Sequence, residues 1–209
     1  MGDFSWHLNS GAISILAITM AMSLYGLLVN GEFLENCMLH PFSVFKGKKL
    51  YTIITSGFIH ANFGHLLFNM LTFFFFSFIL ERVYLGTPGF LILYLTGLIL
   101  CDIPTILKNR NNPGYYSLGA SGAISSVLFC WIIFNPLSEI NIMFIPFGIK
   151  AYIFGPLYLI YCTYASNRQW GNVNHDAHFY GAVVGIVLAF VLNYPIASQL
   201  FYKILNHIE

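Results

Sequence analysis

Residues 119–134 read Gly119-Ala120-Ser121-Gly122-Ala123-Ile124-Ser125-Ser126-Val127-Leu128-Phe129-Cys130-Trp131-Ile132-Ile133-Phe134, an uncharged apolar run that opens with a glycine-flanked serine. With its flanks, the run is long enough to enter a bilayer as a helix. Its small residues suit close packing between membrane helices. They equally suit a serine nucleophile, because glycines admit a substrate backbone and leave a backbone N–H directed at a developing oxyanion. The tetrapeptide at residues 119–122 leaves both interpretations open.

The composition around this run is typical of a membrane protein. Of 209 residues, 57% are hydrophobic and 8% are charged, whereas soluble domains carry roughly 25% charged residues. A net charge of +1 and the absence of any basic cluster beyond the lysines of residues 46–49 argue against a nucleic-acid partner. The cysteines lie far apart and form no CxxC pair, so their spacing indicates neither a disulfide framework nor a zinc site. They are Cys37, Cys101, Cys130 and Cys162.

Six apolar segments predict an all-α, polytopic bundle of six transmembrane helices, with residues 1–209 forming one membrane domain and no separate soluble domain. The expected spans are residues 11–29, 58–80, 88–107, 118–134, 151–165 and 177–192. The first apolar run lacks a basic leader and a cleavage site, so we expect a retained span rather than a signal peptide. The connection 30–57 is too apolar for a flexible linker and is expected to fold as a compact loop in the membrane interface. The segment 140–149 is ambiguous.

Unusual polar residues begin every second span. Because successive spans alternate in direction, the second, fourth and sixth spans start at the same membrane face. The second opens with residues 60–69, HANFGHLLFN, the fourth with the serine tetrapeptide, and the sixth with residues 175–181, HDAHFYG. Ionisable groups in membrane helices usually face the bundle interior or a water-filled cavity. We therefore expect one wet cavity at this face.

The sixth span carries a candidate general base for Ser121. His178, Gly181 and Gly185 lie along one helix face, and the two glycines permit a close approach to the fourth span. That approach would bring His178 to Ser121. A serine hydroxyl needs a base within hydrogen-bond reach to take its proton, and histidine is the usual base near neutral pH.

The second span carries candidate oxyanion donors. His65 and Asn69 are four residues apart and share a helix face. The His65 ring, the Asn69 amide and the Ser121 backbone N–H together could stabilise the tetrahedral intermediate of acyl transfer. Read singly, His65 and Asn69 could instead be hydrogen-bonding residues between helices, and His178 a satisfied interface histidine.

These three motifs, HxxxxHxxxN, GASG and AHxxGxxxG, resemble those of the rhomboid family of intramembrane serine proteases, and the resemblance covers nearly the whole chain. It implies a Ser121–His178 dyad without an acidic third member, with His65, Asn69 and the Ser121 amide as oxyanion donors. Gly119, Gly122, Gly181, Gly185 and His60 would support the site. The resemblance further implies that the connection 30–57 is the membrane-embedded first loop of the family, that a substrate helix enters beside a mobile fifth span, and that neither a metal nor an organic cofactor is required.

Two positions depart from the family pattern. The Trp-Arg pair that many members carry in the first loop would fall at Tyr51-Thr52. One helical turn after the serine, where some members have a tyrosine that packs on the catalytic histidine, this chain has Ser125. We expect Tyr180 or an aromatic residue of the fifth span to support the histidine ring instead.

Two other functions compete with the protease. A transporter could use the histidine-rich face as metal or proton ligands, although the spacing is not HExxH and the glycine-flanked serine would then be idle. A catalytically inactive rhomboid relative could bind and escort membrane helices, but both Ser121 and His178 are present. His60 is expected to shape the loop or contact substrate, and His175 and Asp176 to begin a helix with favourable charge.

Orientation is predicted by two signals that disagree. The site face carries Lys46, Lys48, Lys49, Lys108, Arg110 and Arg168, and the opposite face carries Arg82, Lys150 and Lys203. The positive-inside rule alone would place the site in the cytoplasm. The resemblance implies cytoplasmic termini and a site that opens outward, and we follow it. We expect a multi-pass protein of a bacterial plasma membrane that cleaves transmembrane proteins within the lipid bilayer; the sequence carries no signal for the physiological substrate or the oligomeric state.

Overall fold

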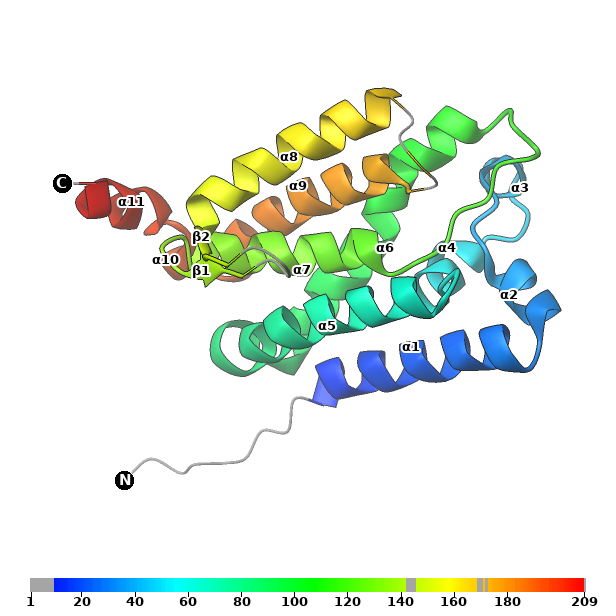
Figure 1. Cartoon of the computed structure of the whole chain (residues 1–209), viewed down its shortest axis with the longest axis horizontal. Coiled ribbons are helices and arrows are strands. Elements are labelled where there is room, and N and C mark those ends of the chain that lie inside the picture. The colour runs from blue at the N-terminus through cyan, green and yellow to red at the C-terminus, as the bar shows by residue number, and fades with distance from the viewer. Residues whose placement is uncertain (1–9, 142–145, 169–170, 172, 209) are drawn as a thin grey trace.

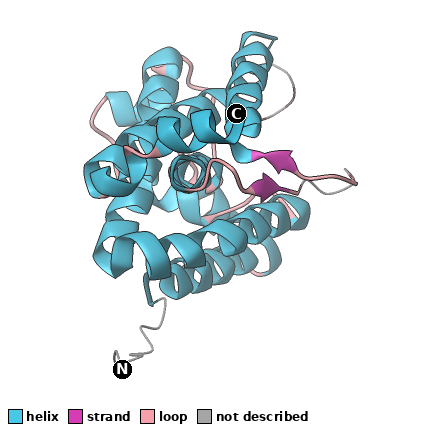
Figure 2. Cartoon of the chain, turned by 90° about the vertical axis from the view of Figure 1, so that its left-hand side faces the viewer, coloured by secondary structure: helices cyan, strands magenta, loops and turns pink. Residues whose placement is uncertain are grey.

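The computed structural model describes residues 10–141, 146–168, 171 and 173–208, and the described chain is predominantly helical (Figures 1 and 2). This confirms the all-α prediction. The elements are α1 Ser10–Leu28, α2 Gly31–Cys37, α3 Pro41–Phe45, α4 Thr52–Thr55, η1 Ser56–Phe58, α5 Phe63–Ile79, η2 Leu80–Leu85, α6 Gly86–Asn109, α7 Ser121–Phe134, β1 Glu139–Ile140, β2 Ile149–Lys150, α8 Ala151–Arg168, α9 His175–Leu192, α10 Tyr194–Ala197 and α11 Leu200–Ile208.

The long helices follow the predicted spans in order. Among the described residues, α1, α5, α6, α7, α8 and α9 each have 14 residues or more. Figure 1 shows α5, α7 and α9 starting at the right-hand end of the bundle, where α1, α6 and α8 finish. By length and composition, α1, the stretch Phe63–Asn109 and α9 could cross a membrane, whereas α7 is apolar but shorter. The number of crossings stays a prediction.

The largest difference from the predicted bounds is at the start of the second long helix. The second long helix begins at Phe63 rather than at residue 58, because Ser56–Phe58 forms a 3₁₀ turn and the Asn62 side chain caps α5 by accepting a hydrogen bond from the His65 N–H at 2.8 Å. The strands β1 and β2, which pair antiparallel, lie at the two ends of the ambiguous segment 140–149. Residues 142–145 within that segment lie outside the described residues.

Helix α7 forms the centre of the bundle. Every residue from Gly122 to Phe134 is buried, and α7 packs against α5, α6, α8 and α9. With 14 residues, the helix is about 21 Å long, which is shorter than the bilayer core of about 30 Å. A central helix of this length can begin below the membrane surface, and Ser121 is its first residue.

The approach of α9 to α7 depends on glycine. A Cβ added at Gly181 would lie 2.1 Å from the carbonyl oxygen of Gly122, and one added at Gly185 would lie 2.2 Å from the carbonyl oxygen of Ser126. The Ser126 hydroxyl donates a hydrogen bond to the Gly181 carbonyl at 2.8 Å. Backbone therefore lies directly against backbone, which leaves no room for a side chain at either position of α9.

The first loop is folded into α2, α3, α4 and η1, and a bridge between Leu39 and Ser117 joins it to the segment before α7. At the positions of the expected Trp-Arg pair, the Tyr51 hydroxyl donates to the Asn36 carbonyl at 3.2 Å and the Thr52 hydroxyl to the Lys49 carbonyl at 2.7 Å. Both hydrogen bonds remain within the loop. They stabilise its own turns rather than anchoring it to the bundle.

Candidate active site

The serine and the histidine singled out in the sequence are in hydrogen-bonding contact. His178 Nε2 lies 2.7 Å from Ser121 Oγ. Ser121 begins α7, and His178 lies in the first turn of α9, whose start is capped by the Asn174 side chain accepting from the Ala177 N–H at 3.1 Å. This distance is within the reach needed for direct proton transfer from the hydroxyl to the imidazole.

The face of the His178 ring is covered by Tyr158 of α8. The two rings are stacked, with centroids 6.5 Å apart and an interplanar angle of 13°. The Tyr158 hydroxyl lies 3.0 Å from the hydroxyl of Ser125, one turn after Ser121. Tyr180, the other expected partner of the ring, is 41% exposed and packs on Phe179. Of the two expected ring partners, the fifth long helix therefore supplies the contact.

The backbone before Ser121 requires glycine. Gly119 has φ +119°, which L side chains rarely adopt, and an added Cβ would lie 2.6 Å from Cε1 of His65. The Gly119 N–H donates to the carbonyl of Ser56 at 2.9 Å. At Gly122, a Cβ would lie 2.4 Å from Sγ of Cys101. The two glycines let the turn into α7 pass between its neighbours.

His60 supports the same turn and is completely buried. Its Nε2 accepts from the Ala120 N–H at 3.4 Å, and its Nδ1 lies 3.0 Å from the hydroxyl of Ser23, which donates onward to the Phe58 carbonyl at 3.1 Å. These contacts require a neutral ring with its proton on Nδ1. Burial, with a smaller contribution from His65, lowers the pKa of His60 to about 3. Of the two roles expected for His60, the geometry fits shaping of the loop.

The candidate oxyanion donors lie on α5 and at the start of α7. The His65 ring lies against His60, with centroids 4.8 Å apart, and lines the cavity that also contains Ser121. Asn69 is buried, and its Nδ2 donates to the His65 carbonyl at 3.0 Å, leaving a second amide hydrogen. The first N–H groups of a helix have no acceptor within that helix. The Ser121 N–H, the His65 ring and the Asn69 amide can therefore each donate.

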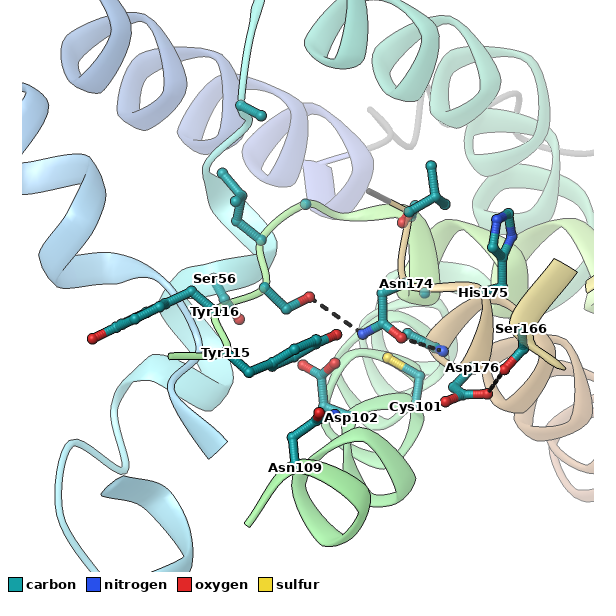
Figure 3. A pocket seen from close by; sticks show the side chains of 18 of the residues that line it. Ser56, Cys101, Asp102, Asn109, Tyr115, Tyr116, Ser166, Asn174, His175 and Asp176 are labelled. Atoms are coloured by element: carbon teal, nitrogen blue, oxygen red, sulfur yellow. Dashed lines mark hydrogen bonds between the residues drawn. The ribbon is translucent and has the colours of Figure 1, made fainter. Parts of the chain in front are cut away.

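Ser121 lines a polar cavity of about 960 Å³. Figure 3 shows this cavity from close by. Asn174 lies at its wall and donates to Thr105 Oγ1 at 3.0 Å and to Ser117 Oγ at 3.2 Å. The carboxylates that line the cavity are those of Asp102 and Asp176. Such a lining suits water, which a hydrolase needs next to its nucleophile.

Charged and polar contacts tie three helices together at the rim of this cavity. Asp176 accepts from Lys108 Nζ at 2.6 Å. It also accepts from the hydroxyl of Ser166, as Figure 3 shows. It also lies in the first turn of α9, where a negative charge is favourable, as expected. Lys108 belongs to α6 and Ser166 to α8, so the sequence offered no spacing from which these partners could be found.

Several known proteins with sequences similar to this chain carry the rhomboid name. The model of the rhomboid domain matches residues 47–195. The chain is 26% identical over 174 residues to RHOMBOID-like protein 12, mitochondrial, of Arabidopsis thaliana, covering 76% of this chain and 51% of that protein. It is 27% identical over 201 residues to Rhomboid protein 1, mitochondrial, of Saccharomyces cerevisiae, covering 94% of this chain and 57% of that protein.

A bacterial relative is also similar. YdcA of Bacillus subtilis, which likewise carries the rhomboid name, is 30% identical over 150 residues, covering 68% of this chain and 66% of that protein. The chain spans about half the length of the two mitochondrial relatives. Because relatives with mitochondrial names stand beside a bacterial one, a bacterial plasma membrane stays a prediction for this chain.

Proposed function

This chain belongs to the rhomboid family, whose members include intramembrane proteases, and we propose that it is itself a serine endopeptidase that cleaves transmembrane segments with a Ser121–His178 dyad. It is an integral membrane protein, in keeping with its family and its long apolar helices. The observation that carries the proposal is the 2.7 Å contact between Ser121 Oγ and His178 Nε2 beside a polar cavity.

The reaction begins with attack of Ser121 Oγ on a substrate carbonyl as His178 Nε2 takes the hydroxyl proton. The resulting oxyanion is stabilised by the Ser121 N–H, the His65 ring and the Asn69 amide. His178 then gives its proton to the leaving amine, which yields an acyl-enzyme. Water from the cavity attacks the ester with His178 again as the base, and releases the new carboxyl end and the free serine.

A substrate helix must unwind before it is cut, because a peptide bond inside a helix is shielded by the surrounding turns. The cavity lies at the end of the bundle where α5, α7 and α9 begin. We therefore expect cleavage near one end of a transmembrane segment. Segments with low helix propensity and small residues at the cut are the expected substrates.

The transporter alternative has less support from the contacts. His60 is bonded to Ser23 and Ala120, and Asp176 to Lys108 and Ser166. These contacts commit two members of the proposed ligand face to structural roles. An inactive relative is opposed by the close contact within the dyad, because an escort protein needs no hydroxyl bonded to an imidazole.

The test is covalent labelling of the purified protein with a fluorophosphonate, followed by cleavage of a model transmembrane substrate. Wild type should label and cleave, whereas Ser121→Ala and His178→Ala should do neither. Ser117→Ala is the matched control, because Ser117 lines the same cavity four residues before Ser121, and it should still label. Labelling that survives Ser121→Ala would reject the nucleophile, and activity abolished by a chelator would favour a metal-dependent function.

A further inference from the structure

Three side chains that can bind a metal ion lie close together between α8 and α9. Cys162 of α8 and His175 and His178 of α9 each offer one ligand atom, and these atoms lie within 4.8 Å of one another. The two histidines are three residues apart on one helix face, with ring centroids 5.9 Å apart. We propose that Cys162, His175 and His178 bind Zn²⁺ and that the bound ion switches the protease off. The switch rests on the proposed function, whereas the metal site stands on these contacts alone.

The donor set suits zinc in kind and number. Zn²⁺ takes cysteine sulfur at about 2.3 Å and histidine nitrogen at about 2.0 Å, and three protein ligands leave a fourth position for water. In a tetrahedral site the ligand atoms are about 3.5 Å apart, so the longest separation here must close by roughly 1 Å. Rotation of three side chains on two adjacent helices can supply that change. Hard cations such as Mg²⁺ prefer oxygen ligands and should not compete.

The proposed site is buried within the protein, and one of its three ligands lines the polar cavity. Cys162 is completely buried and His175 is 5% exposed. His175 lines the polar cavity, as do Ala165 and Ser166, which lie one turn after Cys162. An ion entering with water would therefore meet the ligands without crossing the hydrocarbon region.

Zinc at this site inhibits the protease whether it binds Nε2 or Nδ1 of His178. If it binds Nε2, the contact with Ser121 is lost. If it binds Nδ1, the neutral ring carries its proton on Nε2 and cannot accept the proton of the serine hydroxyl. The ion would also join α8 to α9, and the family resemblance implies that substrate enters beside α8. Both effects reduce turnover.

Binding is tested without reference to activity by titrating Co²⁺, a coloured substitute for Zn²⁺, into full-length Ser121→Ala protein in detergent micelles. A thiolate-to-cobalt absorption band should appear and should be displaced by Zn²⁺. The band should disappear in Ser121→Ala/Cys162→Ser and persist in Ser121→Ala/Cys37→Ser, because Cys37 lies in α2, away from the cluster. Absence of the band, or its survival without Cys162, would overturn the proposed site.

Inhibition is tested by measuring substrate cleavage at increasing Zn²⁺, with each variant compared to its own metal-free rate. Wild type should lose activity and regain it with a chelator, whereas Mg²⁺ should have no effect. Cys162→Ser and His175→Asn should raise the Zn²⁺ midpoint at least about tenfold, since each removes one ligand. Equal midpoints in all three proteins, or a cobalt band without inhibition, would overturn the switch. If metal-free wild type fails to cleave, that result contradicts the proposed function and not the metal site. The cobalt titration still tests the metal site on its own.

Discussion

At the residue scale, the orientation of His178 depends on a helix that carries neither catalytic group. A base that is free to rotate spends part of its time pointing away from the hydroxyl it must deprotonate. Tyr158 of α8 covers the ring face, and its own hydroxyl is held by Ser125 of α7. Three helices therefore determine where the imidazole points.

Removing this ring should lower turnover more than substrate affinity. Tyr158→Leu eliminates an aromatic contact of about 0.5–1.5 kcal/mol, and a loss of about 1.4 kcal/mol from the transition state corresponds to a tenfold rate reduction. We expect kcat to fall by up to about tenfold with little change in KM, and Tyr158→Phe to have a smaller effect. Steady-state cleavage of a transmembrane substrate in micelles measures both parameters. Tyr164→Leu, at an exposed position on the same helix, is the control, and an equal loss there would reject a specific role for Tyr158.

The neutral ring of His60 makes the stability of the folded protein depend on pH. Its pKa in the folded protein, about 3, lies below the ordinary value of 6.5, so the folded state resists a proton that the unfolded state accepts. The stability that depends on neutral His60 is fully present above about pH 6.5 and declines as the pH falls toward 3, by up to about 1.4 kcal/mol per pH unit. His60→Gln cannot titrate and should show a flatter decline below pH 6.5. Thermal unfolding at a series of pH values measures the difference, and parallel curves would contradict the assignment.

What the sequence predicted at this scale was limited by distance along the chain. Ser121, His178, His65 and Asn69 could be singled out because each lies at the start of an apolar span. The partner of His60 could not, because Ser23 lies 37 residues earlier in another helix. A contact between helices leaves no periodicity in the sequence, so the choice of Tyr158 among the fifth-span aromatic residues, and the role of Asn174, emerged only from the structure.

At the scale of the elements, the dyad depends on how closely α7 and α9 pack. Gly181 and Gly185 place backbone against the carbonyl oxygens of Gly122 and Ser126. Small residues at i and i+4 predicted this approach from the sequence. The late start of α5 was harder to predict, because the apolar run continues through η1 and only the Asn62 cap marks the first turn of the helix.

Adding one methyl group between these two helices should therefore be costly. In Gly181→Ala the new Cβ would lie 2.1 Å from a backbone oxygen, so α9 must move away, at a cost of about 1–3 kcal/mol typical of overpacking. We expect a lower unfolding temperature. The cleavage rate should fall by more than the loss of folded protein explains, because His178 moves with α9. Gly31→Ala is the control, since an added Cβ there meets nothing within 4 Å. Equal stability of the two variants would show that the helices can separate without strain.

The η2 segment illustrates a buried carboxylate used as a helix cap. Glu81 accepts from the backbone N–H groups of Gly11 and Ala12, at 2.9 and 2.7 Å, and from the hydroxyl of Thr87 at 2.6 Å. The Glu81 side chain is 2% exposed. It joins the start of α1 to the start of α6 at the end of the bundle opposite the cavity. The candidate active site thus lies at one end of the bundle, and Glu81 stabilises the starts of α1 and α6 at the other end.

At the scale of the whole molecule, orientation in the membrane decides which compartment supplies water and substrate. The starts of α5, α7 and α9 and the cavity belong to one face. Several cations of that face have structural partners. Lys108 is paired with Asp176, Lys46 lies 3.7 Å from the ring centre of Phe42, and Arg110 lies 5.5 Å from that of Phe45.

These partners reduce the force of the positive-inside count. The rule applies to charges in short loops that are free to stay with the cytoplasmic lipid surface, whereas two of these cations contact aromatic rings of the folded first loop and one is neutralised by a carboxylate. We therefore expect the site to open away from the cytoplasm. A periplasmic reporter inserted within residues 110–113, in a bacterial host, should be active, and the same reporter fused after residue 206 should be inactive. The reverse pattern would mean that the charge count, and not the family resemblance, decides orientation, and the proposed protease would then draw its water and its substrates from the cytoplasmic side.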